Sequence, residues 1–148
     1  MIPGTSAPNG LLMSADERTL YLAQSDYQGV RDLRAYPLRD DDTLGDFTVL
    51  HVFAEAFRGV HRGLDGMRLD TEGNIIACGG WRQAGPGPMI YVFSPSGRVL
   101  ETHPVPVDWP TNCAFGGRGL DTLYTTTYGC HLFRVSNTGR RGSVLFPH

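Results

Sequence analysis

The chain has 148 residues, enough for one domain with its own hydrophobic core. Its net charge is −2 and it contains no basic run, so it offers no electrostatic basis for nucleic-acid binding. The 19 glycines and 10 prolines, with only 19% charged residues, favour a turn-rich all-β protein over a disordered one.

No apolar stretch is long enough to span a membrane, and the first residues lack the charged start and apolar core of a signal peptide. The three cysteines, Cys78, Cys113 and Cys130, are odd in number and lack metal-ligand spacing. We therefore expect a cytoplasmic protein with no membrane partner, whose cysteines are reduced and mostly buried.

The first predicted unit is a strand over 8–13, a turn over 14–18 and a strand over 19–22. Two more strands are expected over 34–38 and 47–52.

The second unit repeats this order, with strands over 63–69 and 75–76 around the turn Asp70-Thr71-Glu72-Gly73-Asn74. Two more strands, over 89–93 and 98–102, flank the hairpin turn Ser94-Pro95-Ser96-Gly97.

The third unit has strands over 110–115 and 122–125 around the turn over 116–121, and further strands over 131–135 and 143–146. No segment sustains the apolar period of an amphipathic helix.

The three units are copies of one another, starting at Asn9, Asp65 and Asn112. Their spacing of about fifty residues is typical of propeller blades or solenoid repeats, and the strand-turn-strand content excludes helical repeats. We predict an all-β chain of three four-stranded β-propeller blades. Within a single segment over 1–148, their approximate bounds are 8–55, 63–105 and 110–148.

Three blades do not close a ring, because propellers usually have about four to eight. Two open sheet edges would remain, which proteins seldom leave exposed. Two interpretations follow: two copies close a six-bladed ring as a homodimer, or an N-terminal half is missing from the chain.

These motifs resemble the senescence-marker-protein, regucalcin and gluconolactonase family, and in particular the second half of its six-bladed propeller. The resemblance rests on Pro8-Asn9-Gly10 with Ser14, Asp16 and Leu20-Tyr21, on Leu64-Asp65-Gly66 with Asp70, Gly73 and Asn74, on Tyr91-Val92-Phe93-Ser94-Pro95-Ser96-Gly97, and on Pro110-Thr111-Asn112-Cys113-Ala114-Phe115-Gly116-Gly117.

The resemblance implies a metal-dependent lactonase with its metal at the top of the central channel. By this resemblance Asn9 matches an asparagine ligand, and Asp65 matches an aspartate that binds the metal and takes part in acid/base chemistry. The family's glutamate ligand and its substrate-binding asparagine have no counterpart here. Asn112 starts the final blade and is a candidate for the substrate site, without a firm ligand assignment.

The residue types agree with this placement. Carboxylate and amide oxygens suit Ca²⁺ best, with Mg²⁺, Mn²⁺, Zn²⁺ or Fe²⁺ as alternatives. Such an ion polarises a lactone carbonyl and lowers the pKa of bound water, and Asp65 could accept the proton. Neither a G-x-S-x-G serine motif nor a dinucleotide fingerprint is present. The alternative is that Asn9 and Asp65 are turn residues and that Asn112 caps a strand.

The loop over 79–88 is long and glycine-rich, and its Trp81 and Arg82 are candidates for substrate contact. A packed indole beside a solvated charge is the alternative. His61 precedes Asp65 and could assist proton transfer, although a single histidine is more often a surface residue.

The predicted function is therefore metal-dependent hydrolysis of a sugar lactone or related cyclic ester, a small-molecule substrate. The alternatives are a non-catalytic calcium-binding or protein-binding propeller, and a truncated family member without activity.

Overall fold

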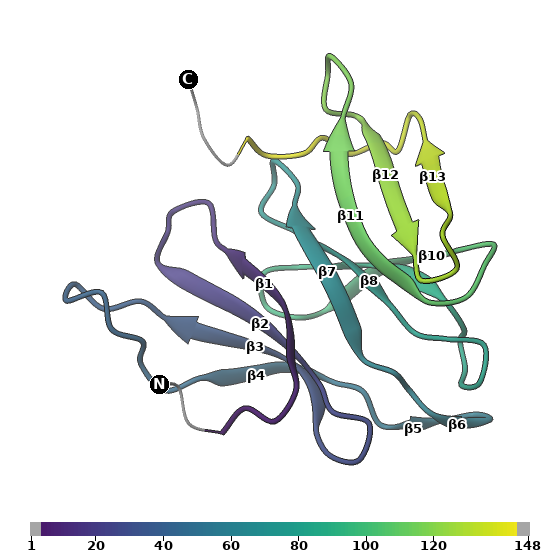
Figure 1. Cartoon of the computed structure of the whole chain (residues 1–148). Coiled ribbons are helices and arrows are strands. Elements are labelled where there is room, and N and C mark those ends of the chain that lie inside the picture. The colour runs from purple at the N-terminus through teal and green to yellow at the C-terminus, as the bar shows by residue number, and fades with distance from the viewer. Residues whose placement is uncertain (1–3, 145–148) are drawn as a thin grey trace.

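Figure 1 shows the computed structural model of the chain, which describes residues 4–144. These residues form strands and no helix, arranged as three antiparallel sheets and one short hairpin. It follows that the described part holds no helix long and apolar enough to cross a membrane. The sheets confirm the prediction of an all-β chain with three blades, of which the first two are four-stranded as predicted.

Each sheet is a meander, in which the strands lie in chain order or its reverse. Blade 1 comprises β1 (Pro8–Met13), β2 (Thr19–Ser25), β3 (Arg31–Pro37) and β4 (Thr48–Val52). Blade 2 comprises β7 (Leu64–Leu69), β8 (Ile75–Gly79), β9 (Met89–Phe93) and β10 (Val99–Pro104). Blade 3 comprises β11 (Pro110–Gly116), β12 (Thr122–Thr127) and β13 (Leu132–Val135). The hairpin of β5 (Glu55–Ala56) and β6 (Gly59–Val60) joins blades 1 and 2 and was not predicted from the sequence.

The innermost strands β1, β7 and β11 lie side by side, with β7 in the middle (Figure 1). Glycines allow this close approach. A Cβ atom on Gly10 of β1 would collide with the carbonyl oxygen of Asp65, and one on Gly66 would collide with Asn112 of β11. The backbones of neighbouring blades therefore touch at the level where the inner strands begin.

Blade 2 is buried on both faces, because its side chains point alternately to two cores. Ile75 and Phe93 belong to the core shared with blade 1, whereas Ile76 and Val92 belong to the core shared with blade 3. This two-sided burial explains why β8 is apolar without alternation.

The chain beyond β13 returns to blade 2. Gly142 forms a bridge with Asp70, and the Ser143 amide donates to the carbonyl of Leu69 at 3.2 Å. The sequence had predicted a strand over 143–146. Residues 143–144 belong to no strand, and 145–146 lie outside the described residues. Blade 3 thus has three strands in the described part of the chain.

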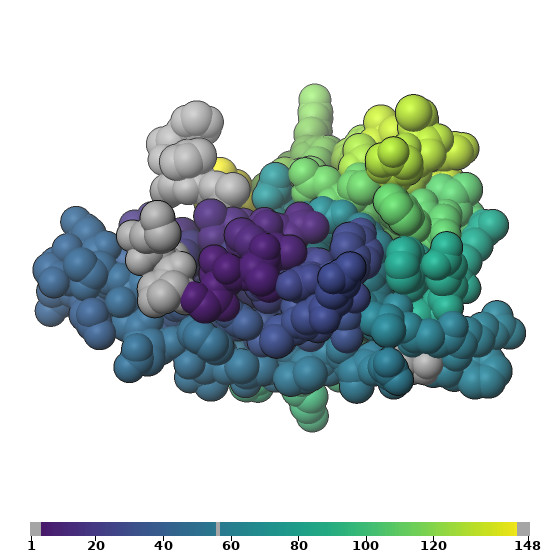
Figure 2. Space-filling view, turned by 60° about the horizontal axis from the view of Figure 1, so that its bottom comes forward, coloured from purple at the N-terminus to yellow at the C-terminus, as the bar shows by residue number. Residues whose placement is uncertain are grey.

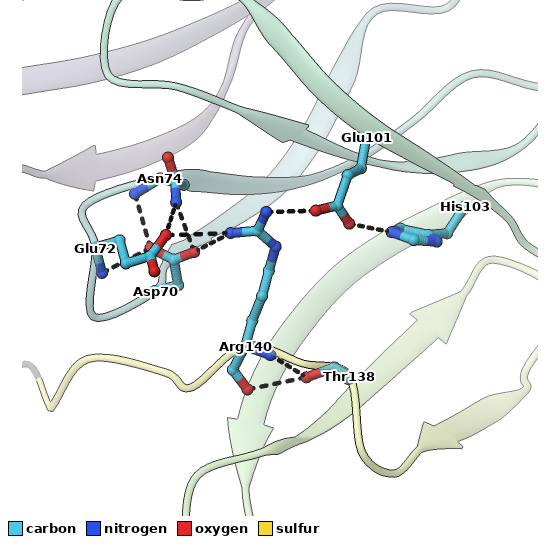
Figure 3. A network of polar contacts seen from close by, with 7 residues as sticks. All are labelled: Asp70, Glu72, Asn74, Glu101, His103, Thr138 and Arg140. Atoms are coloured by element: carbon cyan, nitrogen blue, oxygen red, sulfur yellow. Dashed lines mark hydrogen bonds and ion pairs between the residues drawn. The ribbon is translucent and has the colours of Figure 1, made fainter.

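Arg140 fixes this returning segment to blade 2 (Figure 3). Its Nη1 donates to the carboxylate of Asp70 at 2.6 Å, and its Nη2 donates to Glu101, which also accepts from His103. Asp70 accepts further hydrogen bonds from the backbone amides of Glu72 and Asn74. The predicted turn around Asp70 is therefore also the attachment point of the C-terminal segment.

Candidate functional site

The starts of β1, β7 and β11 meet at one end of the molecule, the end that Figure 2 turns toward the viewer. Asn9 and Asn112 are exposed, and the Asp65 side chain keeps 18% of its surface accessible. Through the contacts of Gly10 and Gly66 the structure brings the three strand starts together, as the repeat predicted.

Each inner strand carries a β-bulge at its start. The register shifts between Pro8 and Leu11 in β1, between Leu64 and Met67 in β7, and between Pro110 and Asn112 in β11. The bulges of β1 and β7 contain Asn9 and Asp65, whereas Asn112 pairs in register with Thr126. Because a bulge redirects side chains and often lies next to an active site, it sets Asn9 and Asp65 apart from Asn112.

Arg62 holds the carboxylate of Asp65. Its Nη1 donates to Asp65 Oδ2 at 2.7 Å, and its side chain is only 6% exposed. The same guanidinium donates to the carbonyls of Pro110 at 2.6 Å and Gly80 at 3.3 Å. It therefore ties the Asp65 carboxylate to the start of β11 and the end of β8. The sequence analysis missed Arg62, whose only signal was a cation three residues before Asp65.

His61 belongs to the core. It is 3% exposed, stacks on Phe53 with ring centroids 4.4 Å apart, and its Nδ1 accepts the amide proton of Gly63 at 2.9 Å. The ring proton therefore lies on Nε2, which contacts the hydroxyl of Tyr91 at 2.9 Å. Burial, with Arg62 nearby, lowers the pKa of His61 to about 4. A buried, neutral imidazole does not support the predicted contact with substrate, and it is not a surface residue either.

Arg82 and Trp81 both form contacts with neighbouring loops, which we call the rim. The amide of Arg82 donates to Asp108 and its guanidinium donates to the carbonyl of Pro106, each at 2.9 Å. The indole of Trp81 donates to the carbonyl of Val60 at 2.9 Å, and its ring lies 6.0 Å from that of Trp109. Arg82 thus holds the loop before β11, and Trp81 is held in place beside it.

The oxygen donors at this end suit a hard cation in kind, but they supply only part of a coordination shell. Asn9, Asp65 and Asn112 offer two amides and one carboxylate, whereas Ca²⁺ takes about six to eight oxygens. Oδ2 of Asp65 is committed to Arg62, and Oδ1 of Asn112 accepts the amide proton of Cys113 at 2.9 Å. Within residues 4–144, no group of three or more His, Cys, Asp or Glu side chains could hold a metal.

The three cysteines differ in how far they are exposed to solvent. Cys78 and Cys113 are buried, and Cys130 is exposed. The contact with Cys113, together with burial, raises the pKa of Cys78 well above its usual value, so this thiol is not a nucleophile at neutral pH.

Residues 1–129 match the family model described as the SMP-30/Gluconolactonase/LRE-like region. A gluconolactonase from Zymomonas mobilis subsp. mobilis is 30% identical over 139 residues, which cover 92% of this chain and 37% of the relative.

Two solved structures share the fold. A luciferin-regenerating enzyme matches with a TM-score of 0.75 and 25% identity, covering 94% of this chain and 48% of the other. A calcium-binding protein, regucalcin from Agrobacterium tumefaciens, matches with a TM-score of 0.63 and 27% identity, covering 82% and 38%. The chain therefore spans less than half the length of each of these proteins.

Proposed function

Because the chain belongs to the SMP-30/gluconolactonase/LRE family, a family of sugar lactonases, we propose that it is the Asp65-bearing half of a lactone hydrolase. The observation that carries this proposal is the position of the Asp65 carboxylate. It lies in the bulge of β7, is held by Arg62, and is flanked by the strand starts that carry Asn9 and Asn112. The proposed substrate is a sugar lactone or related cyclic ester.

Hydrolysis requires water to attack the lactone carbonyl, after which the ring C–O bond breaks to give a hydroxy acid. In the proposed chemistry Oδ1 of Asp65 accepts the proton of the attacking water and then returns this proton to the departing ring oxygen, which leaves the carboxylate as it began. Arg62 keeps the carboxylate oriented by holding Oδ2. A divalent cation held by Asn9 and Asp65, Ca²⁺ in the first instance, would polarise the carbonyl and lower the pKa of water. The relative described as calcium-binding supports this choice of ion.

A complete ring needs more than this chain, which accounts for 37% to 48% of the length of the relatives compared above. The two proposed sources of the remaining blades are a second copy of this chain, related by a twofold axis, and an N-terminal half. A second copy would place another Asn9, Asp65 and Asn112 around the channel. A cytoplasmic location stays a prediction.

The experiment is to measure the solution mass by light scattering, with and without CaCl₂, and then the hydrolysis of D-glucono-1,5-lactone by the same sample. Twice the chain mass of 16.2 kDa, together with hydrolysis, supports self-closure. Asp65→Asn should reduce the rate at least about 100-fold, the size of a lost general base. The matched control is Asp41→Asn, an exposed aspartate in the loop between β3 and β4.

Full hydrolysis by Asp65→Asn in a closed ring would exclude the proposed part of Asp65. Calcium binding without hydrolysis of any lactone tested would favour the non-catalytic alternative instead.

A further inference from the structure

Four aromatic rings form a continuous row across the rim of all three blades, which we call the aromatic row. Neighbouring ring centroids are 5.8 Å apart for Tyr27 and Trp81, 6.0 Å for Trp81 and Trp109, and 5.0 Å for Trp109 and Tyr128. Tyr27 comes from the β2–β3 loop, Trp81 from the β8–β9 loop, Trp109 from the residue before β11, and Tyr128 from the β12–β13 loop. The sequence analysis had singled out only Trp81.

The middle of the aromatic row passes close to Asp65. The guanidinium carbon of Arg62 lies 5.8 Å from the centre of the Trp109 ring, and the same guanidinium is paired with Asp65. A ligand atom held near the Asp65 carboxylate is therefore one side chain away from the middle of the row.

The middle of the aromatic row is held in a fixed conformation. The carbonyl of Val60 holds the Trp81 indole, and the Tyr128 amide donates to the carbonyl of Trp109 at 2.9 Å. Trp109 has a φ of 56°, a left-handed conformation that is strained for a bulky residue. Such strain persists only where the surroundings impose it, and it concentrates at ligand sites.

The ends of the aromatic row are open to solvent. Tyr27 is 52% exposed and Tyr128 is 73% exposed. Neither ring contributes to the two apolar cores, so core packing does not account for them. Asp26 and Gln28 flank Tyr27 in the chain and Asp108 precedes Trp109, so polar residues adjoin the rings.

We propose that the aromatic row is a carbohydrate-binding surface, on which a further sugar ring of a glycosylated aldonolactone stacks while its lactone ring lies at Asp65. This inference rests on the proposed function for the lactone end only. A pyranose ring presents C–H groups on its faces and hydroxyls at its edge, which matches ring faces with polar surroundings. Neighbouring rings in the row are spaced at about the length of one sugar residue, so the row can contact two successive sugars.

The two tryptophans of the chain, Trp81 and Trp109, both belong to the aromatic row, so tryptophan fluorescence reports on this surface alone. The probes are cellotriose and glucose, which contain no lactone. We expect cellotriose to change the emission in a saturable way at concentrations where glucose does not. Because neither probe contains a lactone, this binding tests the surface whether or not the chain hydrolyses lactones.

Tyr128→Leu and Tyr27→Leu remove a ring face and retain apolar bulk. Each should weaken cellotriose binding about fivefold, the size of one lost aromatic contact. Phe57→Leu is the matched control, because Phe57 is 79% exposed and lies outside the aromatic row.

The proposal is overturned if cellotriose leaves the emission unchanged, or if both tyrosine variants bind it as the unsubstituted protein does. A response to the aryl lactone dihydrocoumarin but not to cellotriose would also overturn the sugar assignment. If the tyrosine variants lower the melting temperature and leave binding unchanged, the aromatic row is structural.

Discussion

Strand β7 has an aspartate–arginine pair at each end, and the two pairs differ in what surrounds them. At one end Asp70 is 2% exposed, and both of its oxygens accept hydrogen bonds from Arg140, Asn74 and the amide of Glu72 (Figure 3). At the other end Asp65 is 18% exposed, and only its Oδ2 accepts a hydrogen bond from Arg62. The saturated pair stabilises the fold, whereas the open pair leaves a carboxylate oxygen available for chemistry.

The largest expected effect comes from breaking the saturated pair. Asp70→Ala would leave Arg140 and two backbone amides without their acceptor, so we expect the free energy of unfolding to fall by about 3 kcal/mol. Urea unfolding measures this. The matched control is Asp16→Ala in the equivalent turn of blade 1, an exposed aspartate that should matter much less. An equal loss in both variants would refute the distinction.

The second effect concerns His61, which is buried and precedes Arg62 of the open pair in the chain. Its pKa of about 4 lies below the usual 6.5, so the unfolded chain takes up the proton more readily. The contribution to stability is complete above pH 6.5 and is lost as the pH falls toward 4, by about 3 kcal/mol. His61→Phe should flatten this part of the stability curve, measured by urea unfolding at a series of pH values. His131→Gln, at an exposed histidine before β13, is the matched control.

The third effect concerns the open pair itself. Arg62→Met removes the donors to Asp65 and to the carbonyls of Pro110 and Gly80, and we expect a loss of about 2 kcal/mol in unfolding free energy. Lactone hydrolysis in a closed ring should fall by at least about tenfold, because Asp65 loses its orientation. Arg82→Met is the control, since that guanidinium is exposed and donates to one carbonyl. Unchanged hydrolysis by Arg62→Met would contradict a positioning function.

The smallest effect lies at the edge of the saturated pair. Arg140 and His103 lower the pKa of Glu101 below its usual 4.5, so its contribution is present above pH 4.5 and is lost as the pH falls through the lowered value. Because Glu101 is 40% exposed, solvent screening limits this to a few tenths of a kcal/mol. Glu101→Gln should make unfolding slightly less sensitive to acid in this range, as thermal scans from pH 5 to pH 3 would show. A large change would mean that Glu101 is more strongly coupled than its exposure suggests.

The predicted strands and their grouping into blades came from local signals. Turn residues such as those of Asp70-Thr71-Glu72-Gly73-Asn74 lie between short apolar runs, and hairpins join residues that are near in the chain. The predicted strand over 143–146 is not seen at 143–144, because Gly142 bridges Asp70 and the Ser143 amide donates to Leu69, both of blade 2. The apolar character of a segment does not determine which strand it pairs with.

The positions of Asn9, Asp65 and Asn112 at equivalent strand starts were set by the sequence alone, because a repeated unit places equivalent residues at the same level of the ring. The tertiary structure decided which side chains meet them. Arg62 contacts a carbonyl 48 residues away, Arg140 contacts Asp70 across 70 residues, and the aromatic row gathers rings from three blades. These contacts depend on how neighbouring blades pack, and no local pattern of residues encodes that packing.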